Sequence, residues 1–81
     1  MKSRVEELTS ENFSGNFELP SVILLSRDTC HLCKKLKPIY NIISMMEKYW
    51  GIYKFYIVDA EQQEDIYSRF KSDGVPTIYV V

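Results

Sequence analysis

The chain has 81 residues, so it holds at most one small domain and cannot contain a two-domain enzyme. Its composition is 46% hydrophobic and 14% aromatic, which supports a folded core and excludes an intrinsically disordered protein. Ten Lys and Arg face eleven Asp and Glu, so the basic surplus that binds nucleic acid is missing. No apolar run reaches the ~20 residues that span a bilayer, and no signal-peptide pattern is present. We therefore expect a cytoplasmic protein that binds neither nucleic acid nor membranes.

The first part of the chain predicts two strands and a helix. Residues 5–8 predict a short edge strand, and residues 10–17 predict a helix that starts at a serine cap. Residues 22–25 read Val-Ile-Leu-Leu, an apolar and partly β-branched run between polar neighbours. Such a run is typical of a strand that is buried on both faces.

A long helix is predicted from Cys30 to Trp50, because apolar side chains recur there at steps of three and four residues. Thr29 is the expected cap. Pro38 interrupts the hydrogen-bond ladder and should kink the helix, and Gly51 suits a left-handed residue at its end.

Three more elements complete the pattern. Residues 53–58 predict a strand, residues 59–72 a shorter helix, and residues 77–81 a final apolar strand. Strands that alternate with helices favour an α/β fold with parallel pairing and right-handed crossovers. We expect one domain over residues 1–81.

The chain contains only two cysteines, Cys30 and Cys33, which lie at the predicted junction between a strand and a helix. A disulfide across so short a loop removes little entropy from the unfolded chain, so a chemical role is favoured over a structural one. The helix start lowers the pKa of the first thiol below its usual value of roughly 8.5 and makes it a nucleophile. Cys33, one turn later, can attack a mixed disulfide formed at Cys30. The alternatives are half of a zinc site completed by carboxylates, or two inert buried thiols.

The residues around this pair resemble the thioredoxin family. The resemblance rests on the strand before the Cys-His-Leu-Cys motif, on Pro38 in the helix, and on Gly74-Val75-Pro76-Thr77 before the last strand. It implies a thioredoxin-like three-layer α/β fold with flanking helices and a mixed four-stranded sheet. In that sheet the last strand runs antiparallel to the strand before the motif.

The resemblance also implies a role for each matching residue. Cys30 is the attacking nucleophile and Cys33 the resolving cysteine of a thiol–disulfide oxidoreductase that acts on protein disulfides. Such an enzyme is recycled by a thiol reductase and needs no cofactor and no metal. Pro76 is the cis proline that faces the disulfide, and the backbone of Val75 pairs with the substrate. An X–Pro bond adopts cis at low cost and the residue before it is extended, although an ordinary trans turn proline is the alternative.

Several residues depart from the family pattern. His31 and Leu32 stand where thioredoxins have Gly-Pro, so we expect them to tune the redox potential and the substrate preference. The buried acid of thioredoxins falls at Leu24 and its lysine neighbour near Phe55, so the usual proton route to the resolving cysteine is missing. The imidazole of His31 is a candidate to supply that proton transfer, because it lies next to the nucleophile in the sequence; a solvated loop histidine is the alternative.

The last departure concerns the end of the chain. Thioredoxins continue with a fifth strand and a fourth helix, and we expect this chain to be truncated after its fourth strand. The edge from Thr77 to Val81 and part of the long helix then remain apolar and open, which predicts a homodimer through one of them. A rival function is a non-catalytic thioredoxin-fold binding module that uses this edge, or the groove near Pro76, for a protein partner.

Overall fold

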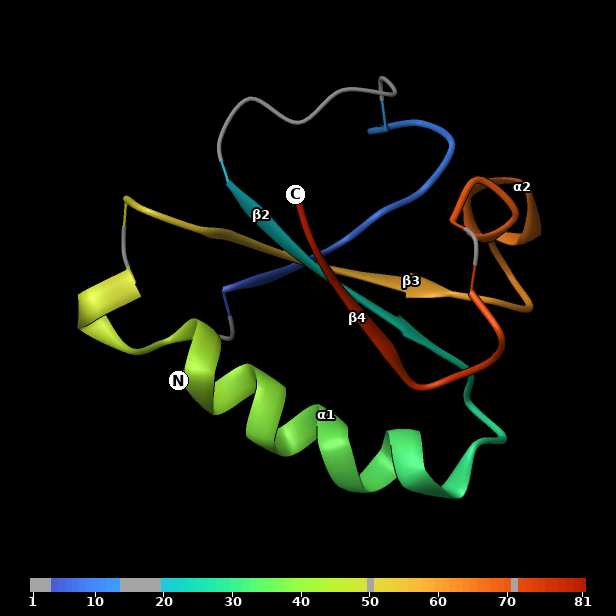
Figure 1. Cartoon of the computed structure of the whole chain (residues 1–81), viewed down its shortest axis with the longest axis horizontal. Helices are drawn as coiled ribbons and strands as arrows, with labels where there is room; N and C mark the ends of the chain where they lie inside the picture. The colour runs from blue at the N-terminus through green and yellow to red at the C-terminus, as the bar shows by residue number, and fades with distance from the viewer. Residues whose placement is uncertain (1–3, 14–19, 50, 71) are drawn as a thin grey trace.

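A computed structural model describes residues 4–13, 20–49, 51–70 and 72–81 (Figure 1). From β2 onward strands alternate with helices, as the sequence predicted, whereas no helix occurs between the first two strands among the described residues. In chain order the elements are β1 (Val5–Glu7), β2 (Ser21–Ser26), α1 (His31–Ser44), the 3₁₀-helix η1 (Glu47–Tyr49), β3 (Lys54–Asp59), α2 (Glu64–Tyr67) and β4 (Thr77–Val80).

The four strands form one mixed sheet in the order β1-β3-β2-β4. Strands β1 and β2 both run parallel to β3, and β4 runs antiparallel to β2. The predicted sheet, including its antiparallel last strand, is therefore confirmed. Because parallel strands end at the same edge, the chain leaves β2 and β3 at one edge of the sheet, and β4 begins there.

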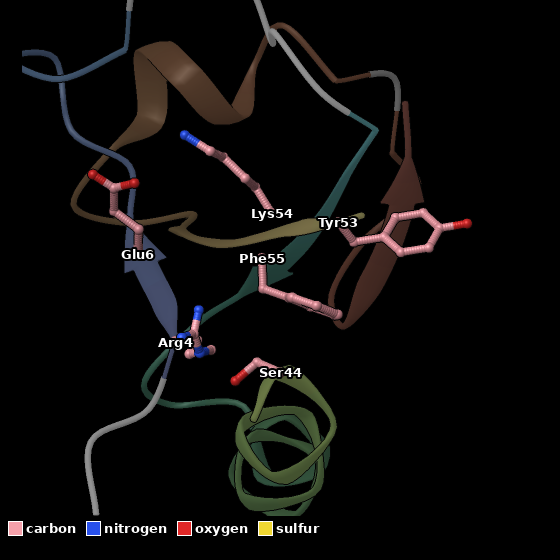
Figure 2. Close-up of a pocket in the computed structure, with 6 residues that line it drawn as sticks. All are labelled: Arg4, Glu6, Ser44, Tyr53, Lys54 and Phe55. Atoms are coloured by element: carbon pink, nitrogen blue, oxygen red, sulfur yellow. The ribbon is translucent and has the colours of Figure 1, made fainter. Parts of the chain in front are cut away.

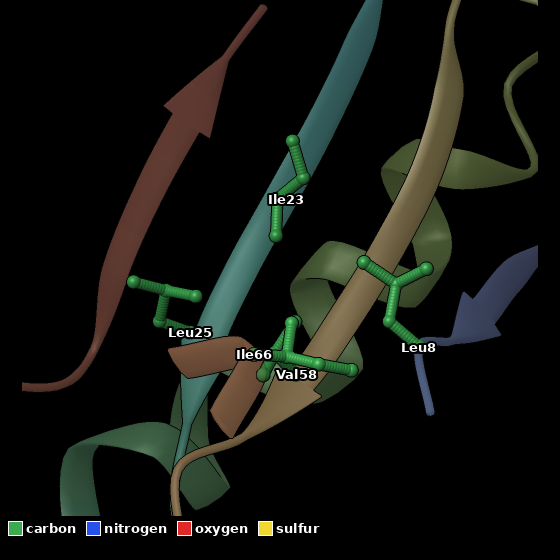
Figure 3. Packing of buried hydrophobic residues seen from close by; sticks show 5 residues of the cluster. All are labelled: Leu8, Ile23, Leu25, Val58 and Ile66. Carbon is green, nitrogen blue, oxygen red and sulfur yellow. The ribbon is translucent and has the colours of Figure 1, made fainter. Parts of the chain in front are cut away.

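Helices cover both faces of the sheet. Successive side chains of a strand point to opposite faces, so the central strands present apolar side chains on both. On one face, Ile23 and Leu25 of β2 pack with Val58 of β3, Ile66 of α2 and Leu8 (Figure 3). On the other face, the buried side chains of Leu24, Phe55 and Tyr40 form a second cluster, to which α1 contributes Tyr40. The two clusters make the predicted three layers.

The predicted cap of α1 is wrong by one residue. The N-cap is Cys30 and not Thr29: the Cys30 sulfur accepts a hydrogen bond from the backbone N–H of Cys33 at 3.3 Å. The Thr29 hydroxyl instead donates to Glu61 Oε1 at 3.2 Å, in the loop after β3. A contact with a residue 32 positions away in the sequence decides which of the two side chains caps the helix.

The predicted end of α1 at residue 50 is also wrong, because the helix ends at Ser44. The Ser44 hydroxyl donates to the carbonyl of Asn41 at 2.7 Å, the kind of local bond that competes with continued helix. The chain goes on into η1, and Gly51, with φ of +76°, lies beyond that short helix. Gly51 is thus left-handed, as predicted, but it does not end α1.

Two other helices differ from their predictions. The helix expected over residues 59–72 is reduced to the four residues of α2. Asp59 Oδ1 accepts hydrogen bonds from the N–H groups of Glu61 and Gln62, both at 2.9 Å, and this turn delays the start of the helix. Of the helix expected over residues 10–17, the described part is a turn in which Phe13 N–H donates to Thr9 O at 3.0 Å. Residues 14–17 lie outside the described residues.

The hydroxyl group of Tyr40 ties α1 to the sheet. It lies 2.7 Å from the carbonyl oxygen of Tyr56 and 2.9 Å from that of Val22, so its proton serves one carbonyl or the other. Burial of the side chain raises the pKa of Tyr40 well above its usual range, which keeps the hydroxyl protonated. The hydrogen bond therefore persists over the whole physiological pH range.

We expect Tyr40→Phe to lower the free energy of unfolding by about 1–2 kcal/mol, because a buried hydrogen bond is lost and a carbonyl loses its donor. Urea denaturation measures this difference. Tyr53→Phe is the matched control, since no hydrogen bond of the Tyr53 hydroxyl occurs among the described residues. Equal stabilities for the two variants would contradict the role of the Tyr40 hydroxyl.

Candidate functional site

Cys30 lies where the chain passes from β2 into α1. The intervening loop closes with a hydrogen bond from Cys30 N–H to Arg27 O at 3.0 Å. As the N-cap, Cys30 holds its sulfur over the first turn of the helix, where free N–H groups point outward. Its side chain is partly exposed, whereas Cys33, one turn further, is fully buried. Both cysteines are free thiols in this structure.

The two thiols differ in acidity. The Cys33 side chain donates a hydrogen bond that lowers the pKa of Cys30, and the N–H groups of Cys33 and Leu32 and the charge of Arg27 act in the same direction. Burial raises the pKa of Cys33, and the sulfur of Cys30 beside it adds to that rise. Cys30 therefore ionises first, and the thiolate that forms is the one that solvent can reach.

Val75 and Pro76 lie beside Cys30, although 45 residues separate Cys30 from Val75 in the sequence. The Cys30 thiol donates to the carbonyl oxygen of Val75 across 3.9 Å. The peptide bond between Val75 and Pro76 is cis, as predicted. Because β4 begins directly after Pro76 and pairs with β2, the antiparallel register carries this segment to the edge where the cysteines lie.

The turn before Val75 is held by hydroxyl groups. Gly74 has φ of +151°, a conformation that favours glycine. The Thr77 hydroxyl donates to the carbonyl of Gly74 at 2.6 Å, and Gly74 N–H donates to Ser72 Oγ at 3.1 Å. These bonds fix the peptide that precedes Val75 and with it the distance to the Cys30 sulfur.

His31 and Leu32 form the first turn of α1 between the two cysteines. Both are exposed, and Leu32 leaves 62% of its surface in solvent. The structure therefore places an imidazole and an apolar side chain next to the reactive sulfur, where an incoming substrate would meet them.

The layer below the cysteines is apolar at the positions that the sequence singled out. Leu24 and Phe55 are buried against Tyr40, so no carboxylate or lysine occupies these two positions. The sequence reasoning missed a polar hollow of about 200 Å³ on the same face of the sheet, at the ends of β2 and β3. The signal in the sequence was the polar residue at the end of each of two apolar strands. Ser26 is the last residue of β2, and Asp59 is the last residue of β3.

Other candidate sites are less informative. A hollow of about 200 Å³ lies at the opposite edge of the sheet from the cysteines, with a lining from β1, β3 and the end of α1 (Figure 2). The part of the chain that the structure describes holds no group of three His, Cys, Asp or Glu side chains that suits a metal ion. Over the same residues, no helix is long and apolar enough to cross a membrane.

Comparison with known proteins agrees with this geometry. The family model "Thioredoxin" matches residues 4–81. The thioredoxin of Borreliella burgdorferi (strain ATCC 35210 / DSM 4680 / CIP 102532 / B31) is 34% identical over 71 residues. The match covers 88% of this chain and 59% of that protein, so this chain spans under two thirds of the relative's length. The chain belongs to the thioredoxin family.

Solved structures share the fold. A thioredoxin from Malassezia sympodialis superposes with a TM-score of 0.84 at 22% identity, over 98% of this chain and 70% of that one. The long form of thioredoxin F from spinach chloroplast gives a TM-score of 0.78 at 20% identity, over 96% of this chain and 66% of that one. The predicted thioredoxin-like architecture is therefore confirmed.

The difference in acidity predicts selective alkylation. At about pH 6.5, iodoacetamide should modify Cys30 well before Cys33, because alkylation follows the thiolate fraction and the exposure of the sulfur. Mass spectrometry of peptides from the native protein gives the two rates, and the urea-unfolded protein is the control. Equal rates in the native protein would remove Cys30 as the nucleophile.

Proposed function

We propose that this protein is a thiol–disulfide oxidoreductase that exchanges electrons with protein disulfides through Cys30 and Cys33. One observation carries the proposal: the sulfur of Cys30 is partly exposed and its pKa is lowered, whereas that of Cys33 is buried one helical turn away. An exposed thiolate attacks, and a buried neighbour resolves the product. Membership of the thioredoxin family supports the same chemistry.

The reaction proceeds in two exchanges. The Cys30 thiolate attacks one sulfur of the substrate disulfide, so that a bond between Cys30 and the substrate forms and the second substrate sulfur leaves as a thiol. The sulfur of Cys33 then attacks Cys30, which closes the bond between the two cysteines and releases the other substrate thiol. Two electrons pass from the cysteine pair to the substrate, and a thiol reductase restores the pair.

Substrate binding is assigned to Val75 and Pro76. The carbonyl of Val75 faces the Cys30 sulfur, so a substrate chain in extended form can pair with this backbone while its disulfide meets the sulfur. Leu32 offers an exposed apolar contact, and His31 offers a titratable group within the motif. We assign the redox tuning and the substrate preference to these two residues.

The proposed reaction requires only the two thiols and an external reductase, so no organic cofactor or metal takes part. A reducing compartment keeps such a pair ready for the next substrate, and the cytoplasm is the location that we propose.

The two-exchange scheme predicts a trapped intermediate. Cys33→Ser should accumulate a mixed disulfide between Cys30 and one sulfur of an insulin disulfide, because attack survives and resolution does not. Non-reducing electrophoresis and mass spectrometry detect the adduct, and Cys30→Ser is the matched control that should form none. If neither variant forms an adduct and the wild type does not reduce insulin, the non-catalytic binding module is the better description.

We also propose that a second copy of the chain covers the open side of the sheet. A groove of about 270 Å³ lies there between α1 and β4, and Ile78 and Val80 leave 47% and 65% of their surface exposed. Ser21 and Val81 exchange both backbone hydrogen bonds, so by antiparallel alternation the N–H and C=O groups of Ile78 and Val80 point away from β2. No described strand pairs with this outer edge. The outer edges of β4 from two copies can pair about a two-fold axis, because each edge presents both N–H donors and C=O acceptors.

Sedimentation at micromolar concentration should therefore show a dimer. Val80→Pro removes an outward N–H without breaking the bonds between β2 and β4, so it should shift the protein to monomer while its cysteines still form a disulfide. Val80→Thr keeps the N–H and the branched shape, and serves as the control. A wild-type protein that sediments as a monomer would contradict the dimer.

A further inference from the structure

The polar hollow near the ends of β2 and β3 has no part in the reaction described so far. Ser26 is the last residue of β2, Asp59 is the last residue of β3, and the two are register partners in the parallel pair. Ser26 is 1% exposed and Asp59 9%. The hollow has a volume of about 200 Å³, and its lining is Glu7, Ser26, Asp28, Lys37, Ile57, Asp59 and Gln62.

The Ser26 hydroxyl is buried and has no hydrogen-bond partner among the described residues. Asp59 uses Oδ1 to accept from two backbone N–H groups, and no described residue engages its Oδ2. A buried hydroxyl without a partner costs about 1–3 kcal/mol, which a water molecule offsets where space and polar partners are present. The hollow provides both, so it suits water held between Ser26 Oγ and the Asp59 carboxylate.

Cys33, fully buried in the first turn of α1, is linked to this hollow through Arg27 and Lys37. The backbone N–H of Arg27, the residue directly after Ser26, donates a hydrogen bond to this sulfur. Lys37, one turn beyond Cys33 on α1, lines the hollow, and its charge also acts on Cys33. Ser26 is thus adjacent in sequence to the backbone group that contacts the sulfur of Cys33.

Four charged side chains line the hollow: Glu7 of β1, Asp28 of the loop after β2, Asp59 of β3 and Lys37 of α1. Glu7 and Asp28 are exposed, and Asp28 Oδ1 lies 3.3 Å from Lys37 Nζ. Asp59 is the buried carboxylate of the set, so it is the one that solvent does not screen. No carboxylate occurs at Leu24, which leaves Asp59 in position to act.

We propose that Asp59, through water positioned by the Ser26 hydroxyl, accepts the proton of Cys33 when Cys33 resolves the mixed disulfide at Cys30. This inference rests on the proposed oxidoreductase function. The proton passes from the Cys33 thiol through the water to the Asp59 carboxylate. The bond between Cys33 and Cys30 forms, the bond between Cys30 and the substrate breaks, and the departing substrate thiolate takes a proton from solvent. Asp59 then returns its proton to water.

The two exchanges can be followed separately with dithiobis-nitrobenzoate, a disulfide that releases one coloured thiolate at each exchange. The first release reports attack by Cys30, and the second reports resolution by Cys33. Asp59→Asn keeps the oxygen that accepts from the two N–H groups and removes the proton acceptor. We expect it to slow the second release about tenfold near neutral pH and to leave the first unchanged.

The pH profile separates proton transfer from a structural role. The deficit of Asp59→Asn should shrink as the pH rises past the usual range of a cysteine thiol, because Cys33 then ionises without help. Ser26→Ala should also slow the second release, with little loss of thermal stability, because no described residue hydrogen-bonds to the hydroxyl that it removes. This variant carries the test if Asp59→Asn does not fold. Asp65→Asn, at an exposed position of α2, is the matched control and should change neither release.

Three results would overturn the inference while leaving the proposed function intact. The first is a second release at the wild-type rate in Asp59→Asn or Ser26→Ala. The second is a deficit of the same size at every pH, which a merely structural role would produce. The third is a slow second release in His31→Ala alone, which would assign the proton to the imidazole. A wild type with no first release would instead overturn the proposed function, and this inference with it.

Discussion

The rest of the structure depends on the pairing of β2 with a strand on each side. Parallel pairing with β3 places the carboxyl ends of both strands at one edge, and antiparallel pairing with β4 makes β4 begin at that edge. Consequently Cys30, which follows β2, and Val75, which precedes β4, lie with their sulfur and carbonyl oxygen 3.9 Å apart. A slip of the β2–β4 register by one residue would turn β4's side chains to the other face and separate the substrate-binding segment from the nucleophile.

Helix capping then makes the two thiols unequal. An ordinary N-cap uses an oxygen, but here the sulfur of Cys30 accepts the N–H of the first turn. The same hydrogen bond that helps α1 to begin therefore helps to hold negative charge on Cys30. Cys33 lies inside the helix, where burial has the opposite effect on its pKa. One structural element thus supplies both the nucleophile and the resolving group.

The absence of a buried acid at position 24 has a consequence for the sheet. Leu24, Phe55 and Tyr40 form a buried cluster, and the Tyr40 hydroxyl uses strand carbonyls as its acceptors. The polar groups of this face lie further along the strands, at Ser26 and Asp59, next to the loop that contacts Cys33. The protein therefore separates an apolar layer that stabilises the fold from a polar hollow suited to proton transfer.

The sequence by itself determined the strands, because each is a short apolar run that can be recognised locally. It also determined the cysteine pair and the family, because the residues of each motif lie close together in the chain. It also predicted the cis bond before Pro76. Only the tertiary structure decided that Cys30 and not Thr29 caps α1, since a distant glutamate engages the threonine. It also decided that α1 stops at Ser44, that Asp59 shortens α2, and that Ser26 and Asp59 meet. The Thr29–Glu61 bond and the pairing of Ser26 with Asp59 join residues far apart in the chain, which a short sequence window does not contain. The ends of α1 and α2 depend on local side-chain hydrogen bonds, which the apolar periodicity does not express.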